Sequence, residues 1–237
     1  MADDGNNPVL LITGASSGIG AATARAAARK HRLVLAARRL EPLQELVEEL
    51  GGEERAIAVR CDVTEWDQVE AMAAATLEAF GRIDAVFANA GFGATRGFLE
   101  ESPEHWRSMV LTNVYGLALT IRATLPHLLE RGDGHFLVTS SVAGRHALPG
   151  SLYSATKWAA TAIGEALRAE LRQMHENNGI KVTLIEPGMV DTPFFDNRPG
   201  KWALQDDDIA RAVIFALEQP GNVDVNEILI RPTSQPI

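Results

Sequence analysis

The stretch Leu10-Leu-Ile-Thr-Gly14-Ala-Ser-Ser-Gly18-Ile-Gly20 decides the fold of this chain. The short apolar run from Val9 to Ile12 is typical of a buried strand in a parallel sheet. The alanine-rich segment after Gly20 favours a helix, and its small side chains let that helix lie close to a sheet. The glycines between them permit positive φ angles and a close backbone approach. A strand, a glycine turn and a helix start together present backbone N–H groups and a positive dipole end to a phosphate.

The glycine spacing is not diagnostic by itself. It reads Gly-x3-Gly-x-Gly, whereas the common dinucleotide-binding fingerprint reads Gly-x-Gly-x-x-Gly. A plain tight turn would also account for these glycines, so the rest of the chain has to decide whether the turn binds a nucleotide.

Apolar strands alternate with amphipathic helices along the chain, with no repeat and no linker. We predict strands at 9–13, 33–37, 56–60, 84–88, 134–140, 180–185 and 226–230. We predict helices at 18–30, 41–50, 65–80, 103–130, 151–176 and 206–218. The alternation predicts an α/β fold, a doubly wound parallel β-sheet flanked by helices on both faces, of Rossmann-like type. The length of 237 residues suits one domain over 1–237, with a flexible tail at 1–7.

Residues of functional types come directly after the predicted strands. They are the turn at 14–20, Arg38, Asp62, the segment 89–91, Ser141 and the pair Pro187-Gly188. In a doubly wound sheet, ligands bind at the carboxyl ends of the strands. The coincidence therefore indicates a nucleotide cofactor.

Tyr153-Ser-Ala-Thr-Lys157 is the most informative chemical motif. Residues four apart on a helix share one face, so the tyrosine and the lysine would lie one turn from each other. A phenol has a pKa near ~10 and is a poor acid or base at neutral pH, but a fixed ammonium beside it lowers that pKa. A tyrosine tuned in this way does general acid/base work on an alcohol or carbonyl oxygen. The pair alone is common by chance on amphipathic helices, and its context gives it meaning.

Together these motifs resemble the short-chain dehydrogenase/reductase family. The segment 13–20 resembles the family's cofactor turn, and Asn89-Ala90-Gly91 resembles its signature after the fourth strand. The resemblance runs from about Val9 to the C-terminus, with several motifs in the right order. The chain departs from the family at position 88, where an alanine stands in place of the first of two asparagines.

The resemblance implies a catalytic set of Asn113, Ser141, Tyr153 and Lys157. Asn113 would bind a water that links Lys157 to solvent, although a polar residue on a partly exposed helix face is the plainer interpretation. Ser141 would hydrogen-bond the substrate oxygen where charge develops. Counting back from Tyr153 would select Ser140 instead, because the intervening stretch is one residue shorter than the family's. We prefer Ser141 on its Ser-Val-Ala-Gly pattern, because deletions fall more easily in a loop than at a strand end.

The resemblance also implies the residues that bind the cofactor. They are Gly14, Ser16, Ser17, Gly18, Ile19, Gly20, Arg38, Arg39, Asp62, Val63, Asn89, Ala90, Gly91, Tyr153, Lys157, Pro187, Gly188, Val190 and Thr192. Within this set, Lys157 would hold the nicotinamide ribose, Thr192 the carboxamide and Asp62 the adenine amine. Asp62 equally suits an acid at a helix start, and Thr192 a turn residue.

The end of the second strand, Ala37-Arg38-Arg39, indicates which nicotinamide cofactor is bound. An acidic residue there would accept from the ribose hydroxyls of NAD and repel a 2′-phosphate. This sequence has no acid at that place, and arginine matches phosphate geometry with paired donors. We therefore predict NADP (NADPH), with NAD disfavoured. Arg38 is the expected phosphate ligand and Arg39 the weaker candidate, because side chains alternate along a strand. Two solvated arginines at a strand end are the alternative.

The substrate is constrained least. The segment 193–205 is aromatic at first and rich in turn residues, which is typical of a loop that covers a substrate. Candidate lining residues are Phe92, Arg96, His146, Leu148, Phe194, Phe195 and Arg198. The C-terminal stretch from Asn226 resembles family members that act on small 3-hydroxy acids, amino alcohols and related aldehydes.

Composition excludes several other classes of protein. A net charge of −9 argues against nucleic acid as a partner, and no apolar run approaches the ~20 residues that a bilayer span needs. From its polar, acidic composition we expect the start to be a frayed tail and not a signal peptide. The single cysteine excludes an internal disulfide framework and fits a reducing compartment, so we expect a cytoplasmic protein. The 6 histidines show no ligand spacing, and no metal site is expected.

These observations predict an NADP-dependent oxidoreductase that transfers a hydride between nicotinamide and a small alcohol or carbonyl substrate. A reductase of bulkier ketones, such as steroids or acyl thioesters, is a second possibility, and a catalytically silent nucleotide-binding regulator is a third. The complete Asn-Ser-Tyr-Lys set argues against the regulator. By resemblance we expect a homo-oligomer, a tetramer or a dimer, in which the apolar faces of helices 103–130 and 151–176 are candidate interfaces.

Overall fold

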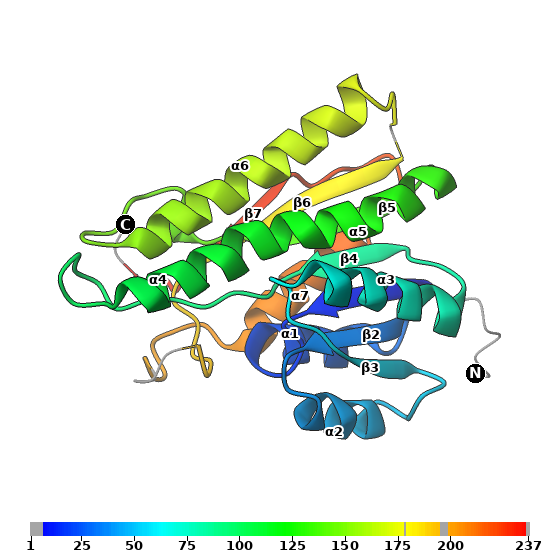
Figure 1. The fold of residues 1–237 in the computed structure, drawn as a ribbon, viewed down its shortest axis with the longest axis horizontal. Coiled ribbons are helices and arrows are strands. Elements are labelled where there is room, and N and C mark those ends of the chain that lie inside the picture. The colour runs from blue at the N-terminus through cyan, green and yellow to red at the C-terminus, as the bar shows by residue number, and fades with distance from the viewer. Residues whose placement is uncertain (1–6, 178, 195–198, 236–237) are drawn as a thin grey trace.

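A parallel β-sheet forms the centre of the molecule (Figure 1). The structure is a computed structural model that describes residues 7–177, 179–194 and 199–235. Within these residues seven strands pair in parallel in the order β3-β2-β1-β4-β5-β6-β7. The strands are β1 (Val9–Thr13), β2 (Arg32–Ala37), β3 (Ala56–Arg60), β4 (Ala85–Ala88), β5 (Gly134–Thr139), β6 (Ile180–Pro187) and β7 (Glu227–Ile230). The predicted doubly wound sheet is confirmed.

The order of strands reverses at β1. Strands β2 and β3 lie on one side of β1, and β4 to β7 follow on its other side. In an open α/β sheet, such a reversal between two neighbouring strands marks the place where a ligand binds, at their carboxyl ends. The residues at that place are those that follow Thr13 and Ala88, the last residues of β1 and β4.

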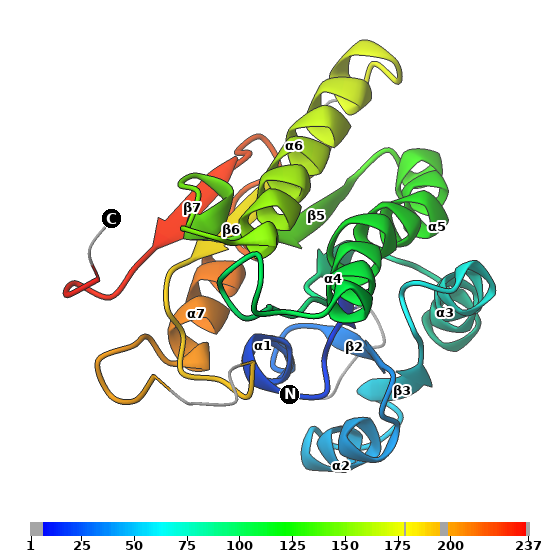
Figure 2. The ribbon, with the colours of Figure 1, turned by 60° about the vertical axis from the view of Figure 1, so that its left-hand side comes forward.

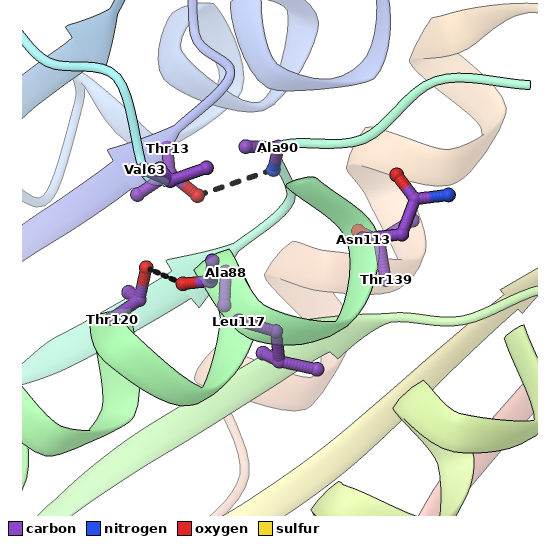
Figure 3. A pocket seen from close by; sticks show the side chains of 9 residues that line it. Thr13, Val63, Ala88, Ala90, Asn113, Leu117, Thr120 and Thr139 are labelled. Carbon is purple, nitrogen blue, oxygen red and sulfur yellow. Dashed lines mark hydrogen bonds between the residues drawn. The ribbon is translucent and has the colours of Figure 1, made fainter. Parts of the chain in front are cut away.

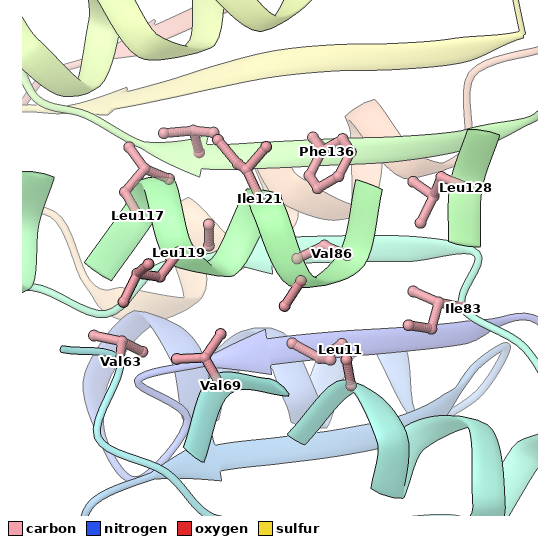
Figure 4. Close-up of a cluster of buried hydrophobic side chains, with 14 of the residues drawn as sticks. Leu11, Val63, Val69, Ile83, Val86, Leu117, Leu119, Ile121, Leu128 and Phe136 are labelled. Carbon is pink, nitrogen blue, oxygen red and sulfur yellow. The ribbon is translucent and has the colours of Figure 1, made fainter. Parts of the chain in front are cut away.

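Helices cover both faces of the sheet (Figure 2). One apolar layer contains side chains from α1 (Gly18–Ala27), α2 (Glu41–Glu49) and α7 (Asp206–Leu217). The other contains side chains from α3 (Trp66–Phe80), α5 (Gly116–Arg131) and α6 (Leu152–Gln173). Figure 4 shows part of this second layer, where Leu11, Val86 and Phe136 of the sheet meet side chains from α3 and α5. Strands covered on both faces read as continuous apolar runs, as β1 does.

The helix predicted at 103–130 is interrupted in the structure. It divides into α4 (Pro103–Val110), a π-helical turn η1 (Leu111–Tyr115) and α5. A π turn holds one more residue than an α turn and occurs often at functional sites. Apolar periodicity could not reveal it, because contacts with distant residues fix the turn, as the site shows below.

The other predicted elements are present with small shifts at their ends. Helix α1 ends at Ala27 and not at residue 30, and β6 continues beyond residue 185 to Pro187. A short 3₁₀ turn, η2 (Val142–Gly144), follows β5 and was not predicted. In the described ranges, no helix combines the length and the apolar character that crossing a membrane requires.

Candidate active site

The glycine-rich turn after β1 is too tight for side chains. Gly14 has φ +68° and Gly18 has φ +53°, values that other residues rarely adopt. A Cβ on Gly20 would overlap the carbonyl oxygen of Gly14. These glycines are therefore fixed by the backbone path, whatever the turn binds.

The residues after β1, β4 and β5 hold one another in place. The Thr13 hydroxyl accepts from the backbone N–H groups of Asn89 at 3.1 Å and Ala90 at 3.2 Å; Figure 3 draws the second bond. The Asn89 amide donates to the Thr13 carbonyl at 3.2 Å and accepts from the Thr139 hydroxyl at 3.0 Å. Asn89 thus connects the ends of three neighbouring strands.

The start of α1 is open to an anion. Ser17 is the N-cap, and among the described residues no side chain caps this helix. The first N–H groups of a helix then need another partner, and a phosphate at the positive end of the dipole satisfies them. The backbone of residues 16–20 therefore fits the diphosphate of a dinucleotide. Ile19 and Gly20 lie in the first turn of the helix.

Both arginines that follow β2 are exposed, and only Arg39 is recorded in contact with the glycine-rich turn within the described part of the chain. Its Nη2 donates to Ser16 Oγ at 3.3 Å. The sequence favoured Arg38 because side chains alternate along a strand, but β2 ends at Ala37. Alternation no longer applies beyond that residue. Alternation therefore gives Arg38 no preference, and Arg39 is the arginine that contacts the turn.

Asp62 and Val63 follow β3 and lie between that strand and α3. The Asp62 carboxylate accepts from the Thr64 N–H at 3.0 Å and from the Thr64 hydroxyl at 2.9 Å. Val63 is buried, and a Cβ on Gly116 would lie 2.6 Å from its Cγ2. The carboxylate therefore caps the turn at Thr64 and not the start of α3, whose N-cap is Glu65, and its adenine contact stays a prediction.

Ser141, Tyr153 and Lys157 meet beyond the end of β5. The Ser141 hydroxyl lies close enough to the Tyr153 phenol to favour its ionised form. Lys157 Nζ lies 5.6 Å from the centre of the Tyr153 ring and donates to the Thr139 carbonyl at 2.9 Å. The tyrosine and the lysine share one face of α6, as their spacing predicted.

The two candidate serines point to different partners. Ser140 Oγ donates to the Lys157 carbonyl at 3.0 Å and pairs with Thr161 Oγ1 at 2.7 Å, so it faces α6. Ser141 faces the Tyr153 phenol and donates to the Pro187 carbonyl at 3.3 Å. The structure thus brings Ser141 to the Tyr153 phenol and Ser140 into hydrogen bonds with α6.

Burial governs the ionisation of the tyrosine and the lysine. It raises the pKa of the half-buried Tyr153 to about 12, and the hydrogen bond with Ser141 acts in the opposite direction. Burial also lowers the pKa of Lys157 to about 8. The expectation that Lys157 sets a low tyrosine pKa does not hold in this structure, because removal of water from the phenol outweighs what favours the phenolate. The phenol is therefore protonated at neutral pH.

Asn113 is buried inside the site and does not lie on a partly exposed helix face. Its amide donates to the Phe92 carbonyl at 2.9 Å and to Thr156 Oγ1 at 3.0 Å, and its oxygen accepts from the Phe92 N–H at 3.0 Å. A Cβ on Gly91 would lie 3.0 Å from that oxygen. These contacts join the segment after β4 to α6 and explain why the helix forms a π turn here.

A cavity of about 10 Å³ lies beside Asn113 (Figure 3). Its lining residues are Thr13, Val63, Ala88, Ala90, Asn113, Gly116, Leu117, Thr120 and Thr139. A cavity needs roughly 10–15 Å³ by this measure, and polar partners, to hold one water. The threonines and the asparagine supply polar groups, so the cavity has room for a single buried water.

The segment after β6 closes the other side of the glycine-rich turn. A Cβ on Gly18 would lie 3.2 Å from Thr192 Cβ, so this segment touches the turn. Gly188 donates to the Ile230 carbonyl at 2.7 Å, and Val190 is buried. Of the predicted residues, Pro187, Gly188, Val190 and Thr192 thus lie in one wall.

The predicted substrate residues are only partly brought together. The Phe194 ring meets the Tyr153 ring edge-on, with centroids 5.8 Å apart. A Cβ on Gly93 would lie 2.9 Å from Phe194 Cε1, and Phe92 adjoins this contact. Leu148 is held by its N–H on Ser154 Oγ at 3.0 Å. Arg96 and His146 are exposed, and Phe195 and Arg198 lie outside the described residues.

Sequence reasoning missed a charged pair next to Ser141. Arg145 Nε donates to Glu186 Oε1 at 2.7 Å, and the glutamate is 0% exposed. A signal was present, because Glu186 interrupts an apolar strand that a doubly wound sheet buries on both faces.

Comparison with known proteins agrees with this geometry. The family model for short chain dehydrogenase matches residues 8–201. An uncharacterized oxidoreductase of Listeria monocytogenes is 37% identical, over 97% of this chain and 98% of that protein.

Three solved structures carry further information. The alcohol dehydrogenase of the archaeon Thermococcus sibiricus, complexed with 5-hydroxy-NADP, is 35% identical with a TM-score of 0.89 and covers 98% of this chain and 99% of its own. The closed form of a serine dehydrogenase complexed with NADP+ is 31% identical with a TM-score of 0.89, over 97% and 96%. A short chain dehydrogenase/reductase of Burkholderia phymatum in complex with NAD is 30% identical with a TM-score of 0.83, over 96% and 90%.

The matches to these proteins extend over nearly the whole chain. The fold and the arrangement of serine, tyrosine and lysine agree with these matches. This chain belongs to the short-chain dehydrogenase/reductase family and is an oxidoreductase of that family.

Proposed function

We propose that the protein is an NADP-dependent oxidoreductase that interconverts a small alcohol and its carbonyl compound, with Tyr153 as the acid/base. The observation that carries the proposal is the meeting of Ser141, Tyr153 and Lys157 beyond β5. These three residues lie at the same edge of the sheet as the glycine-rich turn, where the strand order reverses between β1 and β4. A nucleotide-binding regulator would have no use for a serine-bonded phenol beside a buried ammonium.

The chain's own residues would manage the proton. When bound, the nicotinamide cofactor exchanges a hydride with the substrate carbon. The Tyr153 phenol, protonated at neutral pH, donates to the carbonyl oxygen in the reductive direction and receives the proton back in the oxidative one. Ser141 donates a hydrogen bond to the same oxygen. Lys157 has a pKa of about 8 and can change its charge near neutral pH, so it suits a proton path behind the tyrosine.

The proposed preference for NADP is based on the residues at the end of β2 and after it. Ala37 leaves no carboxylate to repel a 2′-phosphate, and Arg38 and Arg39 offer two guanidinium groups after β2, of which that of Arg39 contacts Ser16. Two of the three solved relatives carry NADP or a derivative, and one carries NAD. We assign the main phosphate contact to one of the two arginines, with Arg39 the better placed.

A small, polar substrate is proposed because an aromatic ring already occupies the neighbourhood of Tyr153. Phe194 lies edge-on to the phenol, and its ring fits against Gly93 because that residue has no side chain. A steroid would have to displace Phe194, whereas a short alcohol need only fit beside it. The names alcohol dehydrogenase and serine dehydrogenase among the solved relatives point the same way. The segment 193–205 would then cover the substrate.

A homo-oligomer is proposed from exposed apolar side chains on the helices that follow β4 and β5. Val110, Leu111, Tyr115 and Trp158 are each 37% to 50% exposed. A second copy would bury them across a two-fold axis. Light scattering after size exclusion tests this, and a monomer would refute it.

We place the protein in the cytoplasm because its single cysteine is a buried free thiol.

The experiment that tests the function is a panel of alcohols and carbonyl compounds, with oxidation and reduction of each cofactor followed by absorbance. Short hydroxy acids, amino alcohols and aldehydes should turn over faster than steroids or acyl thioesters, and faster with NADP(H) than with NAD(H). Turnover of none of these compounds would refute the enzymatic proposal. A preference for NAD(H) would refute the cofactor assignment alone.

A further inference from the structure

Arg145 and Glu186 form an ion pair next to the turn that follows Ser141. Arg145 follows the turn η2, whose N-cap is Ser141, and Glu186 precedes Pro187, whose carbonyl accepts from Ser141. Arg145 Nε donates to Glu186 Oε1 at 2.7 Å, and Arg145 Nη2 lies 2.5 Å from Glu227 Oε1 on β7. The ion pair therefore connects the same two segments that the bond from Ser141 to Pro187 connects.

Stability alone does not explain a carboxylate at position 186. The Glu186 side chain is fully buried in a strand whose residues are all buried. Burial raises the pKa of this carboxyl, and Arg145 opposes the rise. Replacing a buried ion pair by well-packed apolar residues is often neutral or stabilising. The pair therefore calls for a reason other than its own contribution to folding.

The turn that carries Ser141 is held from its other side by α6. A Cβ on Gly144 would lie 2.5 Å from Ser140 Oγ and 2.7 Å from the Lys157 carbonyl oxygen. Ser140 itself is bonded to that carbonyl and to Thr161. The turn η2 is thus clamped between α6 and β6, and Arg145 and Glu186 form the clamp on the β6 side.

We propose that Arg145 and Glu186 are positioning residues that hold the Ser141 hydroxyl within reach of the Tyr153 phenol. A serine hydroxyl has one proton to donate. Its bond to the Pro187 carbonyl, at 3.3 Å, is long for an O–H···O contact. A small shift of η2 along β6 therefore decides whether the proton points to Pro187 or to the phenol and the substrate oxygen. The catalytic meaning of this rests on the proposed function, but the geometry does not.

The chain offers a matched control at the opposite end of the same strand. Arg172 Nη2 lies 3.2 Å from Asp224 Oδ2, and Arg172 Nη1 donates to the Ile180 carbonyl at 3.0 Å. Arg172→Met removes an arginine of α6 and its ion pair beside the start of β6, away from η2. Arg145→Met removes the proposed clamp. Glu186→Gln keeps an oxygen that accepts from Arg145 Nε and should preserve the position.

The direct readout needs neither cofactor nor substrate. The sequence contains 2 tyrosines, Tyr115 and Tyr153, so labelling tyrosine with ¹³C at Cζ gives two resonances. Ser141→Ala defines the shift of the Tyr153 resonance when its hydrogen bond is lost. Arg145→Met should move that resonance toward the Ser141→Ala position, whereas Glu186→Gln and Arg172→Met should leave it near wild type. Tyr115 is the internal reference.

Kinetics supply the second readout once a substrate is known. Arg145→Met should lower kcat by about tenfold, less than the ~10² expected for loss of an oxyanion donor, with little change in KM for the cofactor. Glu186→Gln should retain most of the activity. A Tyr153 resonance that stays in place in Arg145→Met, or that moves equally in Arg172→Met, overturns the inference. A protein that shows the shift but turns over no alcohol refutes the proposed function instead.

Discussion

Each end of the central sheet holds a buried lysine, and the two ends use it differently. Lys181 at the amino end is 8% exposed and Lys157 at the carboxyl end is 4% exposed, and burial lowers the pKa of both. Each donates to a backbone carbonyl, at 3.0 Å and 2.9 Å. Asp224 raises the pKa of Lys181, whereas the neighbour of Lys157 is the Tyr153 phenol. A carboxylate near Lys181 favours its charged form, whereas Lys157 lies beside the phenol that we propose as the acid/base.

The same contrast extends to the surrounding polar groups. At the amino end, Asp84 accepts from the Val9 N–H at 2.8 Å, from Arg82 at 2.8 Å and from Arg131 at 3.0 Å. At the carboxyl end, the start of α1 has no side-chain cap among the described residues. Polar groups that saturate one another stabilise a fold, and polar groups left with spare donors can bind something else. The polar residues at the amino end of the sheet therefore stabilise the fold, whereas those at the carboxyl end are available to bind a ligand.

The sharpest test of this contrast is loss of the phenol. Tyr153→Phe should lower kcat by about 10²–10⁴, the range of a lost general acid, and leave the melting temperature close to wild type. Lys181→Met, at the other end, should act on the melting temperature and leave kcat unchanged. Near-normal turnover by the tyrosine variant would remove the distinction between the two ends. Steady-state kinetics and calorimetry on both variants decide it.

A second comparison uses two adjacent serines at the carboxyl end. Ser141→Ala should lower kcat/KM by roughly 10², because a donor to the reacting oxygen is lost. Ser140→Ala leaves the Lys157 carbonyl without its side-chain partner, so it should cost about 1–3 kcal/mol of stability. Its kinetic effect should be the smaller one. If the larger kinetic loss occurs in Ser140→Ala, the assignment by the Ser-Val-Ala-Gly pattern is wrong.

The arginines after β2 allow a third comparison. Charge-assisted hydrogen bonds are worth about 1.5–3 kcal/mol each, so loss of the true phosphate ligand should reduce the preference for NADP over NAD by about tenfold or more. We expect this for Arg39→Leu and a smaller effect for Arg38→Leu. Adding Ala37→Asp, which repels the phosphate, should lower the preference further. Initial rates with NADPH and NADH measure all three, and a larger effect of Arg38→Leu would restore the order expected from strand alternation.

The smallest expected effect belongs to the amino end. Burial lowers the pKa of His135 to about 3, below the ordinary value of 6.5. The native imidazole stays neutral while the unfolded one gains a proton, so stability falls as the pH falls below 6.5. Between pH 6 and 5 the loss should be about 1 kcal/mol. His135→Gln, which retains a donor for Thr183, should reduce this loss without changing kcat. Urea unfolding at both pH values measures the free energy of unfolding of each protein. An equal loss in wild type and in His135→Gln would contradict the prediction.

The doubly wound parallel sheet and the strand-end positions of the site residues could be predicted because they depend on local patterns. Apolar runs and glycine turns identify β1 and α1, and right-handed crossovers then bring their ends together. Ser141 and Tyr153 meet as predicted for the same reason. Element ends shifted by a few residues, as at α1, because fraying and capping are not encoded by periodicity.

The remaining features depend on contacts between distant residues. The π turn at 111–115 follows from hydrogen bonds of Asn113 to Phe92 and Thr156, which no local pattern contains. The high pKa of Tyr153 follows from its burial, whereas a helical wheel shows only the neighbouring lysine. The contact of Arg39 with Ser16 depends on where β2 ends, and a strand's last residue is the least predictable part of it.

The π turn also has a consequence for how this chain can be aligned and edited. A π turn takes up one surplus residue, so the numbering of the apolar positions shifts by one between α4 and α5 while the helix keeps its face toward the sheet. Figure 4 shows Leu117, Ile121 and Leu128 of α5 facing the sheet. Deleting one residue from 111–115 would allow a regular α turn, which keeps those side chains toward the sheet but moves Asn113 from its place. An alignment without a gap between this segment and an uninterrupted α-helix would therefore shift every buried position of one of the two helices by one residue.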